Sequence, residues 1–590
     1  MTVLEKLKKT KSLSELAILL GYEPKALSYI IYKIPNEKKY INFTIPKKNG
    51  GERGIKAPVD KLKKLQRRLA ELLSNCYEEV CIKSKLKRSL SHGFRKKHSI
   101  ITNAMKHRNK RHVFNVDIQD FFPSINFGRV RGFFIKNNHF LLDPKVATAI
   151  AQIACDNNEL PQGSPCSPVI SNLIGHLLDI RMVNLAKKAK CTYSRYADDL
   201  TFSTNRKEFP MIIAIKKNGD DNKWVSGDVL IKSLKKINFE INDNKTSLQN
   251  KTARQVVTGL VVNKRVNIKR EYYKQARSMC HALFHTGEFY IGSKNIPVLE
   301  ISESVKKNEA LPPNSAEMTA KGSQSKKNMT GSIKQLQGIL SYIYQVKGPH
   351  DDRKIGDRRF KPTAVTRLYR EFLFYKHFFS LDRPLIICEG KTDIVYLKCA
   401  LMQLEKEYGT LVKKNDQKGF DFYINFLKLS RNLQNVFAIS EGTSGLVSLM
   451  DIYETYMKPF KGKGKQHPVI MLVDNDSGST EIKKRLKNDS TKPFYYFAEN
   501  LYVKFLTRSS GGEGIAIEDL FDRKVLETKI AGKSFNRMKK IDPQREYGKT
   551  IFADHVIKAR QNSINFDGFK EIFNCFKEVI EDYNQKKAKL

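Results

Sequence analysis

Tyr193-Ser194-Arg195-Tyr196-Ala197-Asp198-Asp199-Leu200-Thr201-Phe202 is the stretch of sequence that decides the fold of this chain. Two runs rich in Tyr, Thr and Phe meet at a pair of aspartates, which predicts a β-hairpin with Asp198 and Asp199 at its tip. Adjacent carboxylates repel each other unless a cation lies between them, and the usual cation is Mg²⁺, bound together with substrate phosphates. The pair therefore suggests a nucleotidyl-transfer centre, whereas an isolated Asp-Asp is more often a simple turn.

A third carboxylate, Asp117, lies upstream at the end of an apolar run over residues 113–117 that predicts a strand. Three acids that meet at one place are enough for a two-metal site. Between Asp117 and the hairpin lies Leu160-Pro161-Gln162-Gly163-Ser164-Pro165-Cys166-Ser167-Pro168, whose glycine and prolines fix an unusual backbone. We expect Gln162 and Ser164 to contact a nucleotide or a template strand.

In this order and spacing, Tyr-Ala-Asp-Asp at 196–199, Asp-x-x-x-Phe-Phe at 117–122 and Pro-Gln-Gly-Ser at 161–164 resemble the palm motifs of reverse transcriptases. The resemblance implies a right-hand polymerase of fingers, palm and thumb, with two Mg²⁺ ions, or Mn²⁺ as the alternative metal, held by the catalytic residues Asp117, Asp198 and Asp199. It also assigns Gln162 and Gly163 to nucleotide binding. Lys245, in the segment over residues 239–246, would protonate the leaving pyrophosphate.

Phe122, five residues after Asp117, has two interpretations. A bulky ring under the sugar of the incoming nucleotide would clash with a 2′-hydroxyl and select dNTPs. Alternation along a strand predicts instead that at least one of Phe121 and Phe122 packs in the core.

Basic side chains precede the catalytic acids. Residues 45–55 predict two strands joined by a glycine turn that displays Arg53, and a basic helix around 61–68 and a loop over 92–100 with Arg95 follow. Cations on such elements neutralise a triphosphate, so the resemblance assigns Arg53 and Arg95 to nucleotide binding. The alternative for any one cation here is a solvated basic face that grips the template backbone.

Two short motifs narrow the family. Asn103-Ala104-Met105-Lys106-His107 precedes the first catalytic strand, and Val257-Thr258-Gly259 follows the hairpin. A lone histidine at helical spacing from an asparagine is more often a satisfied polar contact than a functional residue. Together, however, the motifs resemble the signatures of retron reverse transcriptases, which implies that Asn103, His107, Val257, Thr258 and Gly259 recognise a cognate RNA.

After Val262 the pattern becomes helical and basic, with Lys and Arg interleaved with Tyr272 and Tyr273, which suits a thumb helix laid along a duplex backbone. Residues 303–332 are rich in Lys, Ser, Asn and Gly and predict a flexible loop. A helix is predicted over residues 333–346 from the apolar stripe Leu336, Ile339, Leu340 and Ile343.

A second α/β unit follows. Residues 384–388, 436–440 and 467–473 predict buried strands, with a helix from 391 to about 408. Strands that alternate with helices predict an open, largely parallel sheet whose ligands bind at the carboxyl ends of the strands. Because Glu389, Asp474 and Asp476 fall at these ends, a divalent-metal site is favoured over isolated helix caps.

Glu-Gly-x-x-Asp at 389–393 with Asp-x-Asp at 474–476 resembles the TOPRIM domains of topoisomerases, primases and nucleases. The resemblance implies a Rossmann-like fold, a separate metal site that includes Glu389, Asp474, Asp476 and Glu518, and a catalytic role for Glu389. Paired zinc cysteines typical of a primase are absent from the sequence, which favours a metal-dependent nuclease. The alternative is a non-catalytic domain that binds nucleic acid.

The composition agrees with a nucleic-acid partner, since the 590 residues carry a formal net charge of +45. No apolar run approaches the roughly 20 residues of a spanning helix, and residues 1–13 lack the apolar core of a signal peptide. The nine cysteines show no C-x-x-C pair. We therefore expect a reduced cytoplasmic protein without membrane contact.

These expectations combine into a multidomain α+β and α/β enzyme. Fingers and palm would span residues 1–262, a thumb 263–348, a connector 349–382, a TOPRIM nuclease-like domain 383–525 and a basic helical tail 526–590.

The arrangement resembles the retron reverse transcriptases fused to a TOPRIM domain. It implies RNA-directed DNA synthesis from dNTPs on a cognate structured non-coding RNA, a branched multicopy single-stranded DNA (msDNA) product, and an anti-phage role with the TOPRIM domain as effector nuclease. An oligomer is compatible with the sequence. The alternative is a group II intron-like or other bacterial reverse transcriptase with a non-catalytic nucleic-acid-binding C-terminal domain.

Overall fold

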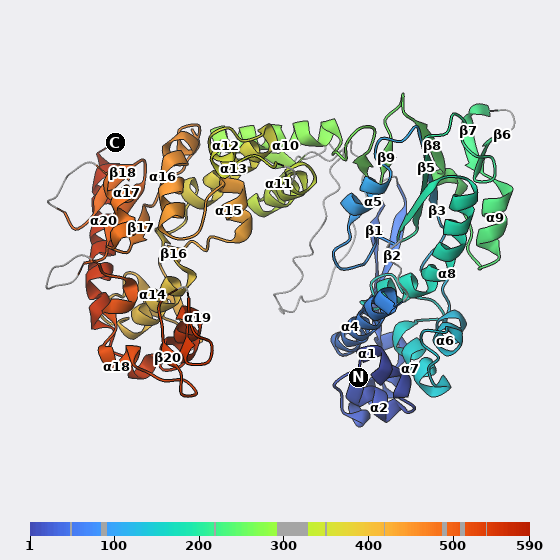
Figure 1. Cartoon of the computed structure of the whole chain (residues 1–590), viewed down its shortest axis with the longest axis horizontal. Coiled ribbons are helices and arrows are strands. Elements are labelled where there is room, and N and C mark those ends of the chain that lie inside the picture. The colour runs from blue at the N-terminus through green and yellow to red at the C-terminus, as the bar shows by residue number, and fades with distance from the viewer. Residues whose placement is uncertain are drawn as a thin grey trace, which may run out of the picture. The chain divides into compact units, whose positions relative to one another are not determined.

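The computed structural model describes residues 1–47, 50–83, 91–217, 220–291, 329–348, 351–417, 419–486, 492–507, 514–538 and 540–589. These residues form two compact units, Met1–Lys269 and Arg270–Leu590, which run from blue to green and from green to red in Figure 1. Each unit has its own sheet and its own hydrophobic core.

A four-stranded antiparallel sheet lies at the centre of the first unit, in the order β4-β5-β3-β8. The strands are β4 Thr192–Tyr196, β5 Asp199–Thr204, β3 His112–Asp117 and β8 Ser247–Asn250. The predicted hairpin is confirmed, because β4 and β5 pair and are joined by Ala197 and Asp198. The predicted strand that ends at Asp117 is also confirmed, and it pairs with β5 in the middle of the sheet.

Helices cover this sheet. The long helix α8 Ser167–Lys188 is buried on most of its faces and packs on β4 and on α4 Asp60–Lys83. It begins directly after the turn that contains Gly163 and Pro165, and it has a proline in its first turn. At that position the N–H that proline lacks would have had no partner within the helix. The other long helices of this unit are α6 Phe127–Lys136, α7 Pro144–Ala154 and α9 Asp228–Lys235.

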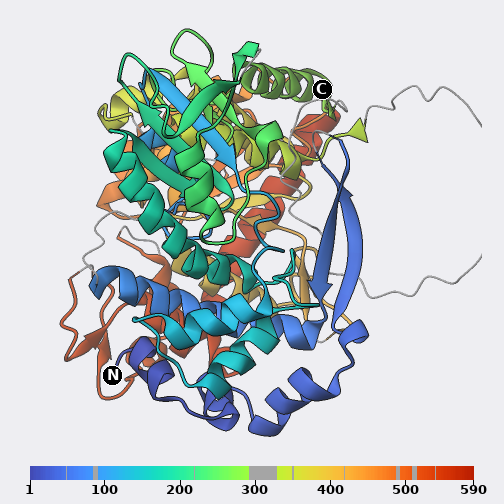
Figure 2. The ribbon, with the colours of Figure 1, turned by 90° about the vertical axis from the view of Figure 1, so that its right-hand side faces the viewer.

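A separate antiparallel ribbon consists of β1 Tyr40–Pro46 and β2 Glu52–Pro58 and is drawn in blue in Figure 2. It confirms the two strands expected around residues 45–55, with Gly50 and Gly51 at positive φ in the turn and residues 48–49 outside the described residues. The remaining elements of the unit are α1 Val3–Lys9, α2 Leu13–Leu19, α3 Pro24–Ser28, η1 Tyr29–Lys33, η2 Asn36–Lys38, α5 Ile100–Lys106, β6 Ala214–Lys217, β7 Asp220–Ser226, η3 Asp243–Lys245, β9 Val256–Val257 and β10 Leu260–Val261.

The second unit begins with the predicted basic helix and with the predicted helix that carries an apolar stripe. They are α10 Arg270–Thr286 and α11 Ile333–Lys347, which pack on each other and on α13 Ala364–Phe374. All four residues of the predicted apolar stripe of α11 are buried. Residues 303–328 of the expected loop lie outside the described residues, and residues 329–330 form β12 Met329–Thr330, paired with β11 Tyr290–Ile291.

A five-stranded sheet follows in the order β16-β13-β17-β19-β18, and all neighbours are parallel except the edge strand β18. The strands are β16 Asn425–Phe426, β13 Leu385–Ile387, β17 Val469–Val473, β19 Leu501–Phe505 and β18 Tyr495–Ala498. The prediction of an open, largely parallel sheet is confirmed.

The strand predicted at residues 436–440 is wrong. Residues up to 437 belong to α15 Arg431–Phe437, whose N-cap Ser430 accepts from Leu433 N and whose buried side chains recur at helical spacing. The helix expected to reach about 408 is α14 Lys391–Gln403, which ends at 403.

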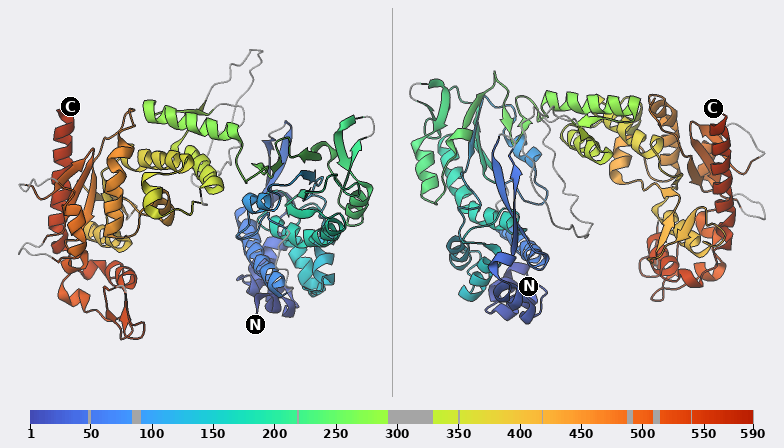
Figure 3. Two further views of the ribbon diagram at one scale, coloured as in Figure 1. Left: turned by 45° about the horizontal axis from the view of Figure 1, so that its top comes forward. Right: turned by 180° about the vertical axis from the view of Figure 1, so that it is seen from behind.

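Residues after 526 pack on the second sheet. Phe552, Phe569, Phe573 and Phe576 are buried in one cluster with Ile470 and other sheet residues, and Figure 3 shows the red helix α20 Lys570–Ala588 beside the strands. This segment is therefore part of the core of the unit. No helix within the described ranges is both long and apolar enough to cross a membrane.

The remaining elements of the second unit are α12 Ile355–Phe360, η4 Tyr375–Phe379, β14 Val412–Lys414, β15 Phe420–Phe422, α16 Thr443–Met457, η5 Ser477–Ser479, α17 Thr480–Lys483, η6 Ile517–Leu520, α18 Arg523–Leu526, β20 Ser534–Phe535, β21 Glu546–Tyr547, α19 Lys549–Ile551, η7 Phe552–Lys558, η8 Gln561–Ser563 and η9 Asp567–Phe569.

A buried ion pair fastens the catalytic hairpin to α8. Arg195 of β4 and Asp179 of α8 are both fully buried, and Nε and Nη2 of Arg195 each donate to one oxygen of Asp179 at 2.8 Å. Nη1 donates to Ala197 O at 3.1 Å, so the same guanidinium reaches the turn before Asp198. This arrangement fixes the hairpin tip relative to the helix layer.

We expect Asp179→Asn to lower the free energy of unfolding of the first unit by about 3 to 5 kcal/mol, because it leaves a buried guanidinium without its counter-charge. The measurement is urea unfolding combined with hydrogen exchange of the β4 and β5 amides. Glu159→Gln is the matched control, since the Lys56–Glu159 pair is partly exposed and should contribute less than about 1 kcal/mol. A loss no larger than that of the control would contradict this role of the buried pair.

Candidate active site

The hairpin tip brings the three predicted catalytic acids to one edge of the first sheet. Asp117 and Asp199 are direct cross-strand partners on β3 and β5, and Asp198 lies in the turn just before β5. Ala197 has a φ of +56°, and Ile118 N donates to Asp198 O at 3.0 Å. The turn is thereby tied to the end of β3, and the three carboxyl groups belong to one local site.

Burial and mutual repulsion raise the pKa values at this tip. Desolvation raises the pKa of Asp199 to about 7, and the charges of Asp198 and Asp117 add to the effect. Desolvation and Asp117 also raise the pKa of Asp198, while Lys245 and Arg53 oppose the rise. Negative charge at this edge is therefore costly until a cation compensates it.

Lys245 of η3 supplies one such cation. Its Nζ lies 3.0 Å from Oδ1 and 3.1 Å from Oδ2 of Asp117. The lysine side chain is 58% exposed and that of Asp117 only 10%, so the ammonium reaches the acid from the solvent side. In this arrangement Lys245 neutralises Asp117.

Within the residues that the structure describes, no group of three or more His, Cys, Asp and Glu side chains is arranged to hold a metal ion. The donor chemistry nevertheless fits Mg²⁺, because Asp117, Asp198 and Asp199 offer hard oxygen ligands from one hairpin and its neighbouring strand. The raised pKa of Asp199 reflects the repulsion that a bound cation would relieve. A metal ion at this edge would compete with Lys245 for the oxygens of Asp117.

Gln162 and Gly163 lie against the β1–β2 ribbon. Lys56 N donates to Gln162 O at 2.8 Å, and a Cβ on Gly163 would come within 2.6 Å of Lys56 O. Gly163 also has a φ of +124°, which side chains rarely adopt. The turn is thus fixed to the strand that carries the exposed Arg53.

Arg95 differs from its predicted role. Its Nε and Nη2 donate to the Glu78 carboxylate at 3.1 to 3.2 Å, its guanidinium lies 5.0 Å from the Tyr77 ring centroid, and its side chain is 7% exposed. Arg95 therefore fastens its loop to α4 and is not free to bind a triphosphate. Sequence alone cannot reveal this, because Glu78 belongs to an earlier helix.

Phe121 and Phe122 differ in burial. Phe121 is 3% exposed and belongs to the core. Phe122 is half-buried, with its ring centroid 5.7 Å from that of Phe121 and 6.2 Å from that of the exposed Phe94. Phe121 thus lies in the core, and Phe122 is a half-buried side chain packed against that core.

Asn103 and His107 are fully buried beneath the hairpin. These side chains are therefore not positioned to contact RNA directly, which corrects the role predicted for them. His107 bonds Ser203 Oγ through Nδ1 and Ser194 Oγ through Nε2, both at 2.7 Å, and Ser194 Oγ donates to Asn103 Oδ1 at 2.6 Å. The Ser194 proton is used by Asn103, so His107 Nε2 carries the proton and Nδ1 accepts from Ser203. Burial lowers the pKa of His107 to about 3, which keeps the ring neutral.

The second signature packs against the first. Thr258 and Gly259 have φ values of +45° and +84° in the two-residue turn between β9 and β10, and the preceding Val257 is buried. Thr258 Oγ1 donates to Ile100 O at 3.3 Å, at the start of α5. Two motifs far apart in the sequence are therefore one structural element, in which α5 lies between the short hairpin and the catalytic strands.

A second acidic centre lies at the edge of the second sheet. β13 and β17 are adjacent and parallel, so the residues that follow them meet. Glu389 Oε1 accepts from Asp474 N at 3.1 Å, and its Oε2 accepts from Thr443 Oγ1 at 2.8 Å. Burial raises the pKa of Asp474 to about 8, and the charge of Glu389 adds to the rise. The structure brings Glu389 and Asp474 together.

Asp476 and Glu518 are engaged in other contacts. Asp476 is exposed, and its Oδ1 accepts from Gly478 N at 2.9 Å as the cap of η5, which is the helix-cap alternative weighed from the sequence. Glu518 is 1% exposed and pairs with Lys549 at 2.9 Å. Of the four predicted acids, Asp476 is thus oriented as a cap and Glu518 is neutralised by a lysine.

Two titratable residues of this centre were not among the predicted site residues. Asp393 accepts from Gly390 N at 2.8 Å, and burial raises its pKa to about 6. Burial disfavours the charge of Lys549, but Glu518, Asp393 and Asp474 outweigh burial and raise its pKa. The Glu-Gly-x-x-Asp spacing was the available signal for Asp393, whereas nothing local marks Lys549.

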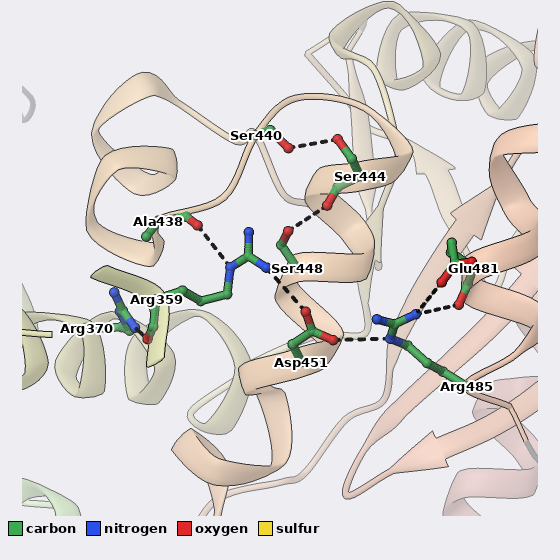
Figure 4. Close-up of polar contacts among 9 residues, drawn as sticks. All are labelled: Arg359, Arg370, Ala438, Ser440, Ser444, Ser448, Asp451, Glu481 and Arg485. Carbon is green, nitrogen blue, oxygen red and sulfur yellow. Dashed lines mark hydrogen bonds and ion pairs between the residues drawn. The ribbon is translucent and has the colours of Figure 1, made fainter. Parts of the chain in front are cut away.

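An ion network holds the segment that carries Thr443. Figure 4 shows Arg359 of α12 donating to Ala438 O at 3.2 Å and to Asp451 of α16 at 3.3 Å. The other oxygen of Asp451 accepts from Arg485 at 3.1 Å. Ala438 ends α15 with a φ of +56°. The loop before α16 is therefore held at both ends beside the acidic centre.

Comparisons with known proteins find similarity over part of the chain. A family model described as reverse transcriptase (RNA-dependent DNA polymerase) matches residues 45–269. The chain is 33% identical over 290 residues to the Retron Mx65 reverse transcriptase of Myxococcus xanthus, covering 45% of this chain and 62% of that protein. It is 33% identical over 249 residues to the Retron Ec86 reverse transcriptase of Escherichia coli, covering 42% of this chain and 70% of that protein.

The chain spans 62% and 58% of the length of the first two curated relatives, both from Myxococcus xanthus. Among solved structures, apo telomerase from Candida tropicalis, truncated from its C-terminal domain, aligns with a TM-score of 0.27 and 14% identity, over 40% of this chain and 56% of that one.

We expect His107→Ala to reduce DNA synthesis on a generic primed RNA and on a cognate RNA by similar factors. The buried ring positions both strands of the hairpin, so its loss should disturb the catalytic edge whatever the template. Primer extension on both templates is the measurement, and exposed His139→Ala is the control. A loss confined to the cognate RNA would restore the direct-recognition role.

Proposed function

Because the chain belongs to the retron reverse transcriptase family, we propose that it is an RNA-directed DNA polymerase whose active site is the edge formed by Asp117, Asp198 and Asp199. The observation that carries this proposal is the cross-strand pairing of Asp117 with Asp199, with Asp198 in the adjoining turn. The matched family model covers all three residues.

In this proposal the three aspartates would hold Mg²⁺, or Mn²⁺ in its place, and the metal would supply activation of the attacking hydroxyl and neutralisation of charge on the transferred phosphate. Lys245 leaves Asp117 when the site fills and donates a proton to the departing pyrophosphate. Its 58% exposure on the solvent side of Asp117 is compatible with that movement.

Other residues would place the nucleotide. Arg53 projects from β2, and Gln162 and Gly163 hold that strand through Lys56. Phe122 would lie under the sugar and exclude a 2′-hydroxyl, because Phe121 already occupies the adjacent core position. Arg95 is left out of the nucleotide site because Glu78 and Tyr77 hold it.

We further propose that the template is a structured non-coding RNA and that the product is msDNA, as the retron family implies. The intron-type alternative loses its support once the retron family is established. The signatures around α5 and the β9–β10 turn would act on RNA through the shape of the surface they build rather than through Asn103 and His107 themselves.

For the second unit we propose a TOPRIM-type, metal-dependent nuclease that serves as effector in anti-phage defence. The support is a largely parallel sheet with Glu389 and Asp474 in contact at its carboxyl edge and Asp393 close by. Asp476 and Glu518 would join the metal site once the cap and the lysine contact are released. The competing function is a non-catalytic clamp that binds the DNA product.

Asp117→Asn, or Asp198→Asn with Asp199→Asn, should abolish DNA synthesis on a primed RNA in Mg²⁺, because the change removes a metal ligand while preserving shape. Primer extension measures the effect. Asp120→Asn is the matched control, since Asp120 is exposed three residues after Asp117 and has a φ of +43° that asparagine also tolerates. Retained synthesis in the Asp117 variant would refute the assignment.

Glu389→Gln or Asp474→Asn should eliminate Mg²⁺-dependent cleavage of nucleic acid and any growth arrest caused by the protein, while DNA synthesis stays near normal. The two sets of acids belong to separate compact units, which is why the activities should separate. Cleavage of single-stranded DNA, duplex DNA and RNA is measured beside primer extension, with Glu441→Gln on the nearby exposed loop as control. If these variants keep their toxicity and bind DNA more tightly, the clamp is correct.

A further inference from the structure

A basic cavity of about 410 Å³ lies beside the catalytic hairpin and is not part of the polymerase site described above. Its walls come from the loop that follows Ser91 and from the side of α5 that carries Thr102, Met105 and Lys106. Thr102 and Met105 belong to the helix wall and His92 to the loop wall. The volume is within the range of small-ligand pockets in proteins.

The rim of this cavity is cationic. Lys97, Lys106 and Arg108 line it and are exposed, and His98 stands edge-on to His92 with 5.2 Å between ring centroids. No carboxylate lines the cavity among the residues described. Such a rim attracts phosphate groups, while the rings and Met105 provide an apolar surface on which a base can stack.

A buried hydrogen-bond acceptor faces no partner inside the protein. His92 is 3% exposed, and its Nε2 has no hydrogen-bond partner among the described residues. Its Nδ1 lies 2.8 Å from Thr102 Oγ1, which donates its own proton to Ser99 O at 2.8 Å. Nδ1 must therefore carry the ring proton, and Nε2 presents an unprotonated lone pair.

The neutral form of the ring is the stable one here. Burial, together with the charges of the neighbouring His98, Lys106 and Arg95, lowers the pKa of His92 to about 4. An unpaired acceptor in a buried position is destabilising, because it has given up its hydrogen bonds to water. A ligand that offers an N–H or O–H donor removes that cost, so the cavity selects a donor at its base and an anion at its rim.

The walls are rigid and joined to the catalytic edge. Phe94 and Lys97 have φ values of +56° and +61°, and Asn172 Nδ2 donates to Gly93 O at 2.8 Å. A Cβ on Gly93 would lie 2.7 Å from Ala197 N, and His92 N donates to Arg195 O at 2.8 Å. The cavity is therefore pre-formed and packed against the turn that carries Asp198.

We propose that this cavity binds one unstacked nucleotide of an RNA strand, with the base or the 2′-hydroxyl donating to His92 Nε2 and the flanking phosphates lying on Lys97, Lys106 and Arg108. The inference rests on the proposed polymerase function and adds a template-side contact to it. In this proposal RNA contacts the exposed side of α5. The buried side chains of Asn103 and His107 do not reach that surface. Cations spread along an open rim suit a continuing strand better than a free mononucleotide.

The test uses the full chain and a mixed-sequence ribo-oligonucleotide that carries 4-thiouridine. After irradiation, crosslinked peptides are mapped by mass spectrometry, since a chain with net charge +45 binds RNA at many places and total affinity reports poorly on one cavity. We expect a crosslink within residues 92–108. The crosslink should be weaker with the DNA oligonucleotide of the same sequence if the 2′-hydroxyl is the donor, and equal if the base is the donor.

His92→Asn is the most informative variant, because an asparagine amide can keep the donor to Thr102 while the Nε2 acceptor is lost. We expect it to lower the yield of this crosslink about fivefold or more. Lys106→Glu with Arg108→Glu should do the same through charge and does not depend on the buried ring. Lys235→Glu with Lys236→Glu on α9 is the matched control, exposed and outside the cavity, and should change the yield by less than about twofold.

An unchanged yield in both cavity variants, or a crosslink map that omits residues 92–108, overturns the inference. Displacement of the oligonucleotide crosslink by equimolar AMP, GMP, CMP or UMP would also overturn it, in favour of a free-nucleotide site. Primer extension by the unaltered chain is measured separately. If the chain synthesises DNA but gives no crosslink within residues 92–108, only the assignment of the cavity fails. If it gives the crosslink but synthesises no DNA, the polymerase proposal fails.

Discussion

The buried pairing of Arg195 with Asp179 is the constraint on which the first unit depends. Removing two charges from water is costly, and the cost is offset only where geometry is close to ideal and the remaining hydrogen-bonding capacity is used. Both conditions hold here. The guanidinium makes two 2.8 Å bonds to the carboxylate, and Tyr193 donates to the same carboxylate at 2.8 Å. The site also excludes a larger residue on α8, because a Cβ on Gly175 would lie 2.9 Å from the guanidinium. Helix, strand and catalytic turn are consequently one rigid body, and the loop that begins at Ser91 joins it through the Arg195 carbonyl.

Neutral hydrogen bonds perform the corresponding task on the other side of the hairpin. His107 lies between Ser194 and Ser203 on the two catalytic strands, and α5 holds it there because the β9–β10 turn covers that helix. A charged residue in this place would need a second buried counter-ion, whereas a histidine kept neutral by burial needs only two hydroxyl groups. The family signatures thus mark a support for the catalytic edge whose outer face is basic.

Local patterns in the sequence predicted much of this arrangement. The rest of it depends on long-range contacts, which local patterns do not show. Periodicity and turn chemistry predict the hairpin, the strand ending at Asp117, the β1–β2 ribbon with its glycine turn and the apolar stripe of α11. All four are present. The strand expected at 436–440 is wrong because a short apolar run fits a buried strand and a buried helix equally well, and Ser430 provides the helix start. Arg95, Asn103 and His107 were assigned by family resemblance, which carries no information on the burial of a side chain. Glu78, Ser194 and Ser203, which decide their roles, lie on other elements.

Both acidic centres solve the same electrostatic problem in the same way. Each gathers carboxyl groups whose pKa values are raised by burial and by one another, and each places a lysine from a later segment among them. Lys245 and Lys549 stabilise the acids when no other cation is present, since an uncompensated buried charge is destabilising. A divalent ion that binds the same oxygens must compete with the lysine, so its affinity includes the work of separating that ion pair. Lys245 is 58% exposed and its partner Asp117 10%, whereas Lys549 is 37% exposed and its partner Glu518 only 1%. Separating Lys549 from Glu518 therefore leaves a more deeply buried carboxylate unpaired than separating Lys245 from Asp117 does, so the second ion pair is the harder one to break.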